Sequence, residues 1–104
     1  MEIESKLKSI TSQNGVKGYL ILNSDGQKIK TNLETELSDK YQKFIYSMMA
    51  QVNTFFKQVS ENPSNAEGTA DNDLKLMRFR SSYDDVIIAP DGEFTMVILK
   101  EPQS

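Results

Sequence analysis

The hydrophobic positions of the chain fall into two helical stretches and several extended ones. Residues 2–13 carry Ile3, Leu7 and Ile10 at offsets of four and three, which is one narrow helical stripe. Residues 37–60 carry apolar side chains at the same spacings over a much longer run. The pattern therefore predicts a short helix at the start of the chain and a long helix in the middle.

The long helical stretch has a wider apolar side than one packing surface requires. At about 100° per residue its apolar side chains cover a sector of roughly 140°, against about 100° for a helix with a single buried face. Ser38 is the expected N-cap, with Asp39 in the first turn. Most of the stripe is expected in the core, and its margin is available to a partner helix. The apolar positions are Leu37, Tyr41, Phe44, Ile45, Met48, Met49, Val52, Phe55, Phe56 and Val59.

Two extended segments follow the first helix and differ in pattern. Residues 16–23 have apolar side chains on both faces, whereas residues 28–32 have Ile29 and Thr31 on one face and lysines on the other. Residues 24–27 have the composition of the turn between them. We therefore expect a central strand followed by an edge strand that is half-buried through Ile29 and Thr31.

Three more strands are predicted in the last third of the chain, at residues 74–80, 86–89 and 94–99. The Asp91-Gly92 pair indicates a tight hairpin between the last two. Helices and strands therefore do not alternate singly along the chain. This order predicts an α+β domain with an antiparallel sheet.

Length and composition are those of one globular domain. The chain has 104 residues, of which 38% are hydrophobic and 26% charged, so residues 1–104 are expected to form a single domain. Residues 60–73 contain no large apolar residue and are rich in Asn, Ser, Gly and Asp. They are predicted to form an extended loop within that domain.

The absence of both cysteine and histidine narrows the possible chemistry. It removes disulfides, zinc sites built from these residues, imidazole triads and the commonest general base. Asp84 and Asp85 are expected to mark a turn, because adjacent strand-end residues point to opposite faces. The sequence therefore predicts no catalytic residue, no cofactor and no metal site, and an enzyme built on lysine or carboxylates is the remaining alternative.

Charge and hydropathy exclude two further classes of partner. The formal net charge is −3, and no basic cluster is longer than the Arg78 and Arg80 pair, which argues against binding nucleic acid. No apolar run approaches the roughly 20 residues that span a bilayer, which argues against a membrane protein. We expect a soluble, intracellular protein.

Four fragments of the sequence resemble roadblock-type dynein light chains. Residues 13–30, QNGVKGYLILNSDGQKIK, contain a glycine-valine entry, an aliphatic strand and an N-x-x-G turn leading to I-K. NDLKLMRFR at residues 72–80 is similar to the family's N-D-L-x-x-x-R-x-R strand. IAPD at residues 88–91 and VILKEP at residues 97–102 resemble the two closing strands in order and spacing. Together the fragments extend over nearly the whole chain.

The resemblance implies the roadblock fold, a five-stranded antiparallel sheet between a short N-terminal helix and a long central helix, in the order α-β-β-α-β-β-β. It also implies a dimer with itself or a paralogue, in which third strands pair edge to edge into a ten-stranded sheet. Residues 74–80 have apolar side chains on both faces yet would form a sheet edge, which favours such pairing. The interface residues expected from this arrangement are Leu74, Leu76, Met77, Arg78 and Phe79.

The resemblance further implies a non-catalytic accessory light chain of a dynein motor complex. Such a subunit dimerises and binds the dynein intermediate chain, supporting motor assembly and microtubule-based movement in the cytoplasm and cytoskeleton or in the ciliary axoneme. An amphipathic segment of the intermediate chain is expected to dock beside the long helix. The residues expected at that site or between paired helices are Phe44, Met48, Met49, Val52 and Phe56.

Two departures from the family leave the assignment open within it, and the first is that the long helix shares the hydrophobic pattern of the family rather than its individual residues. The connection at residues 60–73 is longer than the family's usual one by about seven residues, so the choice between cytoplasmic and ciliary dynein stays open. A roadblock-type scaffold or regulator of a small GTPase is the alternative function. It would have the same fold and differ only in its partner.

Overall fold

A computed structural model describes residues 2–13, 15–60 and 74–102. The extended loop predicted at residues 60–73 lies outside the described residues, apart from residue 60, where a helix ends. The order of helices and strands is the one that the hydrophobic pattern predicts. The elements are α1 (Glu2–Thr11), β1 (Val16–Asn23), β2 (Lys28–Thr31), α2 (Thr35–Ser60), β3 (Met77–Arg80), β4 (Asp85–Asp91) and β5 (Phe94–Lys100).

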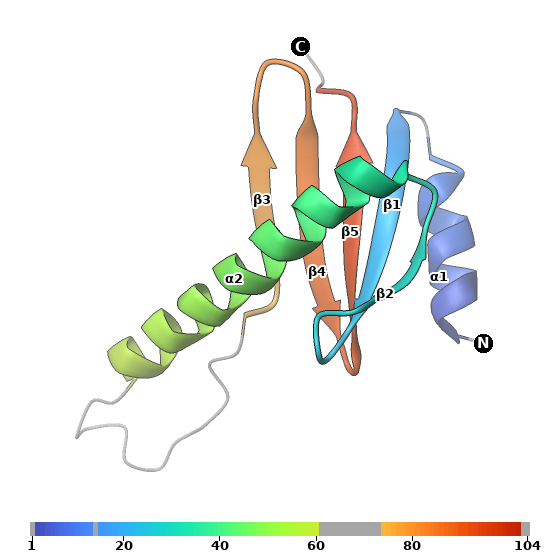
Figure 1. Ribbon diagram of the computed structural model, residues 1–104. Helices are drawn as coiled ribbons and strands as arrows, with labels where there is room; N and C mark the ends of the chain where they lie inside the picture. Colours follow the sequence, from blue (N-terminus) through green and yellow to red (C-terminus); the bar gives the residue numbers. More distant parts are fainter. Residues whose placement is uncertain (1, 14, 61–73, 103–104) are drawn as a thin grey trace.

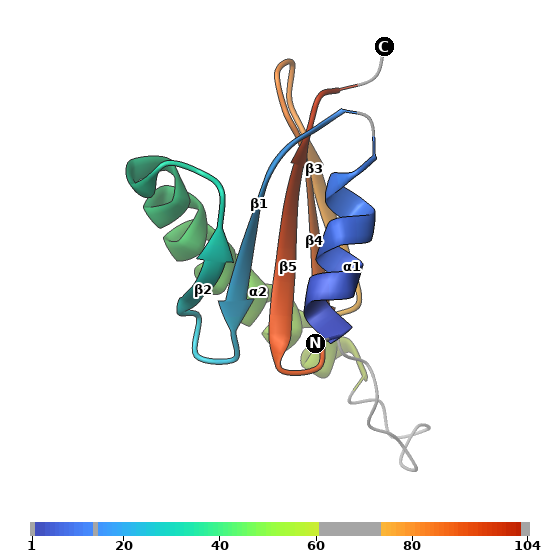
Figure 2. The same cartoon turned by 90° about the vertical axis from the view of Figure 1, so that its right-hand side faces the viewer.

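The strands form one five-stranded sheet in the order β2-β1-β5-β4-β3, and every neighbouring pair is antiparallel. The long helix α2 crosses one face of the sheet diagonally (Figure 1). The short helix α1 lies on the opposite face (Figure 2). As predicted, β1 lies inside the sheet with β2 at its edge, and the fold is the α+β arrangement expected from the sequence.

The main core lies between α2 and the sheet. Alternate residues of β1, β4 and β5 point toward the helix, where Ile45 is fully buried. The remaining buried residues of these strands include Ile21 and Met96, which face the other side of the sheet, where Leu7 of α1 is also buried. The main core cluster consists of Leu20, Leu22, Ile45, Val86, Ile88, Val97 and Leu99.

The predicted N-cap at Ser38 is wrong, because α2 begins three residues earlier. The N–H of Ser38 donates to the carbonyl oxygen of Glu34 at 2.9 Å, which closes the first helical turn. Ser38 is fully buried, and its hydroxyl donates to the Thr35 carbonyl oxygen at 3.0 Å. The same hydroxyl accepts a hydrogen bond from the Lys28 ammonium at 3.0 Å, so it fastens β2 to α2.

The predicted faces of β2 are wrong for Ile29 and Lys28, whereas Thr31 is half-buried as expected. A bulge in the β1–β2 ladder leaves Ile29 as an extra residue between Lys28 and Lys30, which pair with consecutive residues of β1. Ile29 is consequently 53% exposed. Lys28 turns toward α2 instead, where its ammonium forms an ion pair with Asp39. The prediction assumed unbroken alternation, which a bulge interrupts.

β3 is shorter than the predicted strand because its ladder with β4 stops at Met77. Two residues further back along the same register, Lys75 would face Pro90, which has no N–H to donate. Leu74 turns inward instead and is buried, and its N–H donates to the Asn53 side-chain oxygen at 3.2 Å. Only the second half of the predicted strand therefore belongs to the sheet.

Candidate functional site

The edge formed by β3 is the first candidate surface. In the part of the chain that the structure describes, β3 has a neighbouring strand on one side only. The N–H of Ser81 donates to the Asp84 carbonyl oxygen at 2.8 Å. In an antiparallel ladder every second residue bonds to the same neighbouring strand, so this bond identifies which residues of β3 bond to β4. The backbone of Phe79 therefore faces β4, whereas the backbone groups of Arg78 and Arg80 are directed toward the outside of the sheet. That is the side on which another strand can pair.

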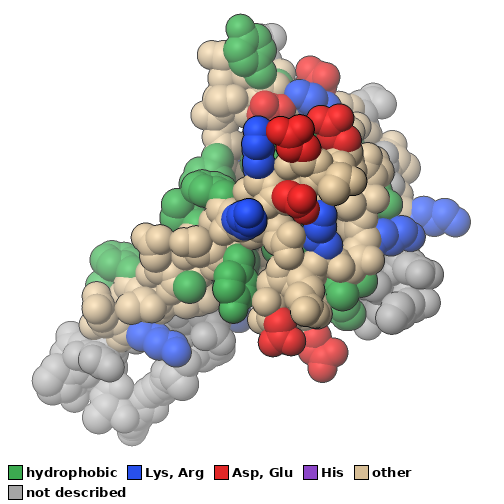
Figure 3. All heavy atoms as spheres, viewed as in Figure 1, with side chains coloured by type: hydrophobic (Ala, Val, Ile, Leu, Met, Phe, Trp, Pro, Cys, Tyr) green, Lys and Arg blue, Asp and Glu red, His purple; other side chains and the backbone are tan. Residues whose placement is uncertain are grey.

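Exposed apolar side chains lie beside this edge. The ring of Phe44, on α2, is 5.7 Å from the ring of Phe79, on β3, and these residues are 47% and 36% exposed. Apolar side chains continue from β3 toward the end of α2 along the left margin in Figure 3. We call this surface the edge stripe. It comprises Phe44, Phe55 and Val59 of α2 with Phe79 of β3.

An ion pair between a half-exposed arginine and a buried carboxylate joins β3 to β4 on the opposite face of the sheet. Asp85 is 2% exposed and accepts two hydrogen bonds from the Arg78 guanidinium, Nε to Oδ1 at 2.9 Å and Nη2 to Oδ2 at 2.5 Å. The hydrogen bond from Arg78 holds the pKa of the Asp85 carboxyl below its ordinary value, and the charges of Arg80 and Lys100 act in the same direction. Asp85 is therefore ionised at neutral pH.

Asp84 has a separate partner. Its carboxylate accepts a hydrogen bond from the Lys17 ammonium at 2.7 Å, and this ammonium also donates to the Tyr83 carbonyl oxygen at 3.2 Å. The bond to Asp84 raises the pKa of Lys17. Asp84 and Asp85 thus interact with different cations, and neither shares a proton or ligand with the other. Burial raises the pKa of the nearby Tyr41 phenol, which is therefore protonated at neutral pH.

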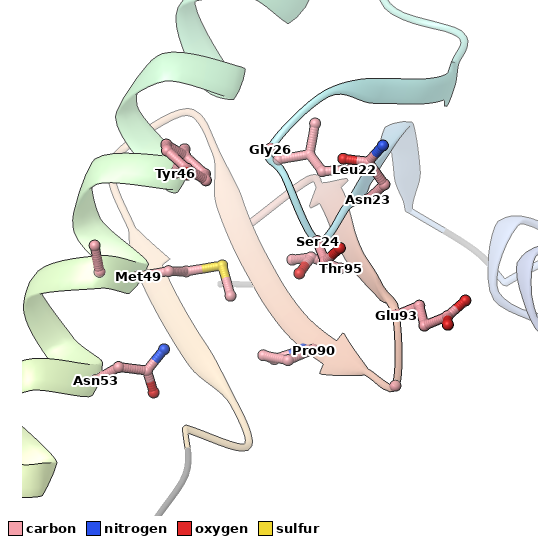
Figure 4. A pocket seen from close by; sticks show the side chains of 12 residues that line it. Leu22, Asn23, Ser24, Gly26, Tyr46, Met49, Asn53, Pro90, Glu93 and Thr95 are labelled. Atoms are coloured by element: carbon pink, nitrogen blue, oxygen red, sulfur yellow. The ribbon is translucent and has the colours of Figure 1, made fainter.

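The second candidate surface is a pocket of about 280 Å³ on the other flank of α2. It lies between the helix and the two hairpin turns β1–β2 and β4–β5 (Figure 4). Met49 and Ala50 line it from the helix and Pro90 from the sheet, while the side chains of Tyr46 and Asn53 lie along the helix side. Its exposed lining is mainly apolar, and polar side chains from the helix and from both hairpins contribute to it.

The β1–β2 turn builds one wall of this pocket. The side-chain oxygen of Asn23 accepts hydrogen bonds from the N–H groups of Asp25 and Gln27, both at 2.9 Å. Gly26 has a φ of +80°, and a Cβ there would overlap the ring of Tyr46. Glycine is therefore required both by the backbone and by the aromatic ring, which explains the N-x-x-G pattern of the turn.

Comparison with known proteins decides the family. The model of the Roadblock/LC7 domain family matches residues 2–100. The chain belongs to this family. The crystal structure of a Roadblock/LC7 domain from Streptomyces avermitilis is similar in fold, with a TM-score of 0.61 and 9% sequence identity over 84% of this chain and 67% of that chain. The Roadblock/LC7 family includes dynein light chains and regulators of small GTPases.

The edge of this roadblock domain contains most of the residues that the sequence assigned to a dimer interface. Leu76 and Phe79 are exposed, Arg78 is half exposed, and Met77 is half-buried against the main core. The side chain of Leu74 is 6% exposed and belongs to the interior. Four of the five predicted residues therefore lie on or beside the edge.

The predicted helix residues are distributed over two flanks of α2 in the roadblock domain. Phe44 lies on the β3 flank and Met49 on the pocket flank. Met48, Val52 and Phe56 are half-buried. The polar members of the pocket, Tyr46 and Asn53 among them, were not predicted, because they lie outside the apolar stripe of the helix.

Two classes of site have no support in the roadblock domain. The described residues contain no group of three or more acidic, histidine or cysteine side chains placed to hold a metal ion. No helix within the described ranges is long and apolar enough to cross a membrane. The candidate sites are thus the two described above, the β3 edge and the pocket on the other flank of α2.

Proposed function

We propose that this roadblock domain is a non-catalytic, dimerising light chain of a dynein motor complex, which binds the intermediate chain and supports motor assembly. The observation that carries the proposal is the β3 edge with the edge stripe beside it. An edge strand flanked by exposed aromatic rings is a liability for a monomer and a docking surface for a second copy. Dimers are also common among roadblock domains.

In the proposed dimer, the β3 strands of two chains pair antiparallel and extend the sheet to ten strands. The β3 flanks of the two α2 helices then lie side by side and cover the edge stripe. Removing apolar surface from water stabilises such a contact by about 25 cal/mol per Å². The partner is a second copy of this chain or a paralogue with a similar edge.

The pocket is the proposed site for the intermediate chain. It opens on the flank of α2 away from β3, so both pockets of the dimer remain accessible. An amphipathic segment of the intermediate chain would insert an apolar anchor between Met49 and Pro90. Two equivalent pockets match two intermediate chains in one motor. The expected locations are the cytoplasm and cytoskeleton, with the ciliary axoneme for an axonemal dynein.

Affinity purification of the tagged chain from its own cells, with mass spectrometry, tests the partner. Dynein heavy and intermediate chains are expected in the eluate. Ala50→Glu introduces a charge at an exposed position of the pocket, so it should abolish intermediate-chain recovery without affecting the dimer. Thr54→Glu, on the exposed side of the helix opposite the buried Ile45, is the matched control. Recovery of a small GTPase in place of dynein chains would overturn the dynein assignment.

A further inference from the structure

Asp85 is an unusual residue in this sheet. Of the ionisable side chains that the structure describes, it alone is buried. Removing a carboxylate from water is unfavourable unless a partner compensates the charge. Here the compensation comes from Arg78, a residue of the edge strand whose own side chain is 55% exposed. The pair thus links a buried position in β4 to the surface proposed for dimerisation.

Three cations lie around Asp85. Arg80 of β3 and Lys100 of β5 are its direct cross-strand neighbours, and Arg78 lies diagonally across the β3–β4 ladder. All three cations face the same side of the sheet, away from α2, and the charge of each acts on Asp85. The guanidinium of Arg78 points toward β4, where it bonds Asp85, and not toward the free edge of β3.

We propose that Asp85 is a positioning residue that enables the β3 edge to accept a second copy of this chain. The inference rests on the dimer of the proposed function. An axis at Arg78 would set the two guanidinium groups directly opposite each other, so we place the two-fold axis at Met77, where Arg78 lies diagonally opposite its own copy with about 7–8 Å between the two positions. Two guanidinium groups at that separation repel each other unless each is neutralised. Asp85 neutralises Arg78 in each copy and holds its head group on the β4 side.

The same geometry selects the partner. A chain that carries an arginine at this edge position without the β4 carboxylate would bring an uncompensated positive charge to the axis. Pairing with such a chain is unfavourable, whereas pairing with an identical copy is not. The arrangement therefore distinguishes a second copy of this chain from edges of similar shape but different charge.

The test is the dissociation constant of the dimer for Asp85→Asn, measured by analytical ultracentrifugation at low and high salt. The substitution keeps the size of the side chain and removes its charge. We expect dimerisation to weaken about tenfold at low salt. The loss should shrink at about 1 M salt, where the screening length is only about 3 Å. Asp84→Asn is the matched control, because it removes the same charge one residue away, where the partner is Lys17.

A second substitution separates positioning from a purely structural role. Adding Arg78→Gln to Asp85→Asn removes the uncompensated cation, so the double variant should recover most of the dimer. A loss that is independent of salt and is not repaired by Arg78→Gln would overturn the inference. Dimerisation of Asp85→Asn equal to that of the wild type would also overturn it and leave the proposed function standing. A monomeric wild type would overturn the dimer itself.

Discussion

The two edges of the sheet are built differently. β2 contains a bulge, and its Lys28 forms an ion pair with Asp39 of α2. Ile29, the one apolar residue of β2, is exposed. β3 has a regular ladder with β4 and an aromatic side chain that contacts another on α2. Bulges and lysines at an edge discourage pairing with other strands, whereas a regular edge beside apolar side chains favours it. The difference between the edges supports the proposal that a second copy pairs with β3 and not with β2.

Cross-linking is expected to give the largest difference between the edges. The backbone of Met77 faces β4, so two copies centred on it would form a non-hydrogen-bonded pair with Cα atoms about 4.5 Å apart. The chain contains no natural cysteine, so Met77→Cys should form an intermolecular disulfide readily on oxidation. Ile29→Cys on β2 should remain unlinked. A cross-link through Leu76→Cys instead would move the axis by one residue.

A charge placed in the edge stripe should have the next largest effect. Phe79→Glu introduces a carboxylate where two edges and their helices meet, and we expect dimer affinity to fall at least about a hundredfold. Ile29→Glu has the same chemistry at the other edge and should leave the affinity unchanged. Sedimentation equilibrium measures both. Equal effects from the two variants would contradict the difference between the edges.

Removing the link between β2 and α2 should have a moderate effect on stability and none on dimerisation. Lys28→Ala deletes the hydrogen bond to Ser38 and the ion pair with Asp39, which is partly exposed. We expect the free energy of unfolding to fall by about 1 kcal/mol. Urea denaturation at fixed protein concentration measures the change, with Lys30→Ala on the same strand as the control. An altered dimer affinity would show that β2 takes part in the interface.

The smallest effect concerns acid. The pKa of Asp85 is lowered in the folded chain by its bond to Arg78, so the carboxylate stabilises the fold above its ordinary pKa of 3.8. That contribution is lost as the pH falls through the lowered value. The difference in unfolding free energy between the wild type and Asp85→Asn should therefore stay constant from neutral pH down to about 4 and shrink below it. A difference that disappears near pH 6 would contradict this assignment.

The sequence was sufficient to predict the elements and their order, because hydrophobic periodicity alone separates helices from strands. It failed where a single residue departs from regular geometry. Ser38 has the composition of a cap, yet its hydroxyl is used across the β2–α2 contact. Ile29 is exposed because of a bulge that no alternation pattern contains. Pro90 is visible in the sequence, but its effect depends on the register that places it opposite Lys75.

The candidate surfaces were predicted unevenly for a related reason. The edge residues follow from the resemblance to a known family and from the strand pattern, both of which are local. The pocket is formed by the β1–β2 turn, the β4–β5 turn and α2, which come together only in the fold. Asp85 was interpreted as part of a turn, because its pairing with Arg78 depends on the β3–β4 ladder. A site formed by residues from separate segments cannot be predicted from the pattern of any one segment.

The shortness of β3 has a consequence for the lifetime of the proposed dimer. Because Pro90 ends the ladder early, β3 directs the backbone groups of only Arg78 and Arg80 outward. Backbone pairing between two such edges adds few hydrogen bonds, each worth about 1 kcal/mol net. A dimer with so short a β3–β3 interface would be held mainly by side chains. It would dissociate and re-form readily, so copies and paralogues could exchange. An intermediate-chain assembly that occupies both pockets would then act as a tether, since it keeps the two domains at high effective concentration. Subunits would exchange before the motor assembles and be retained afterwards.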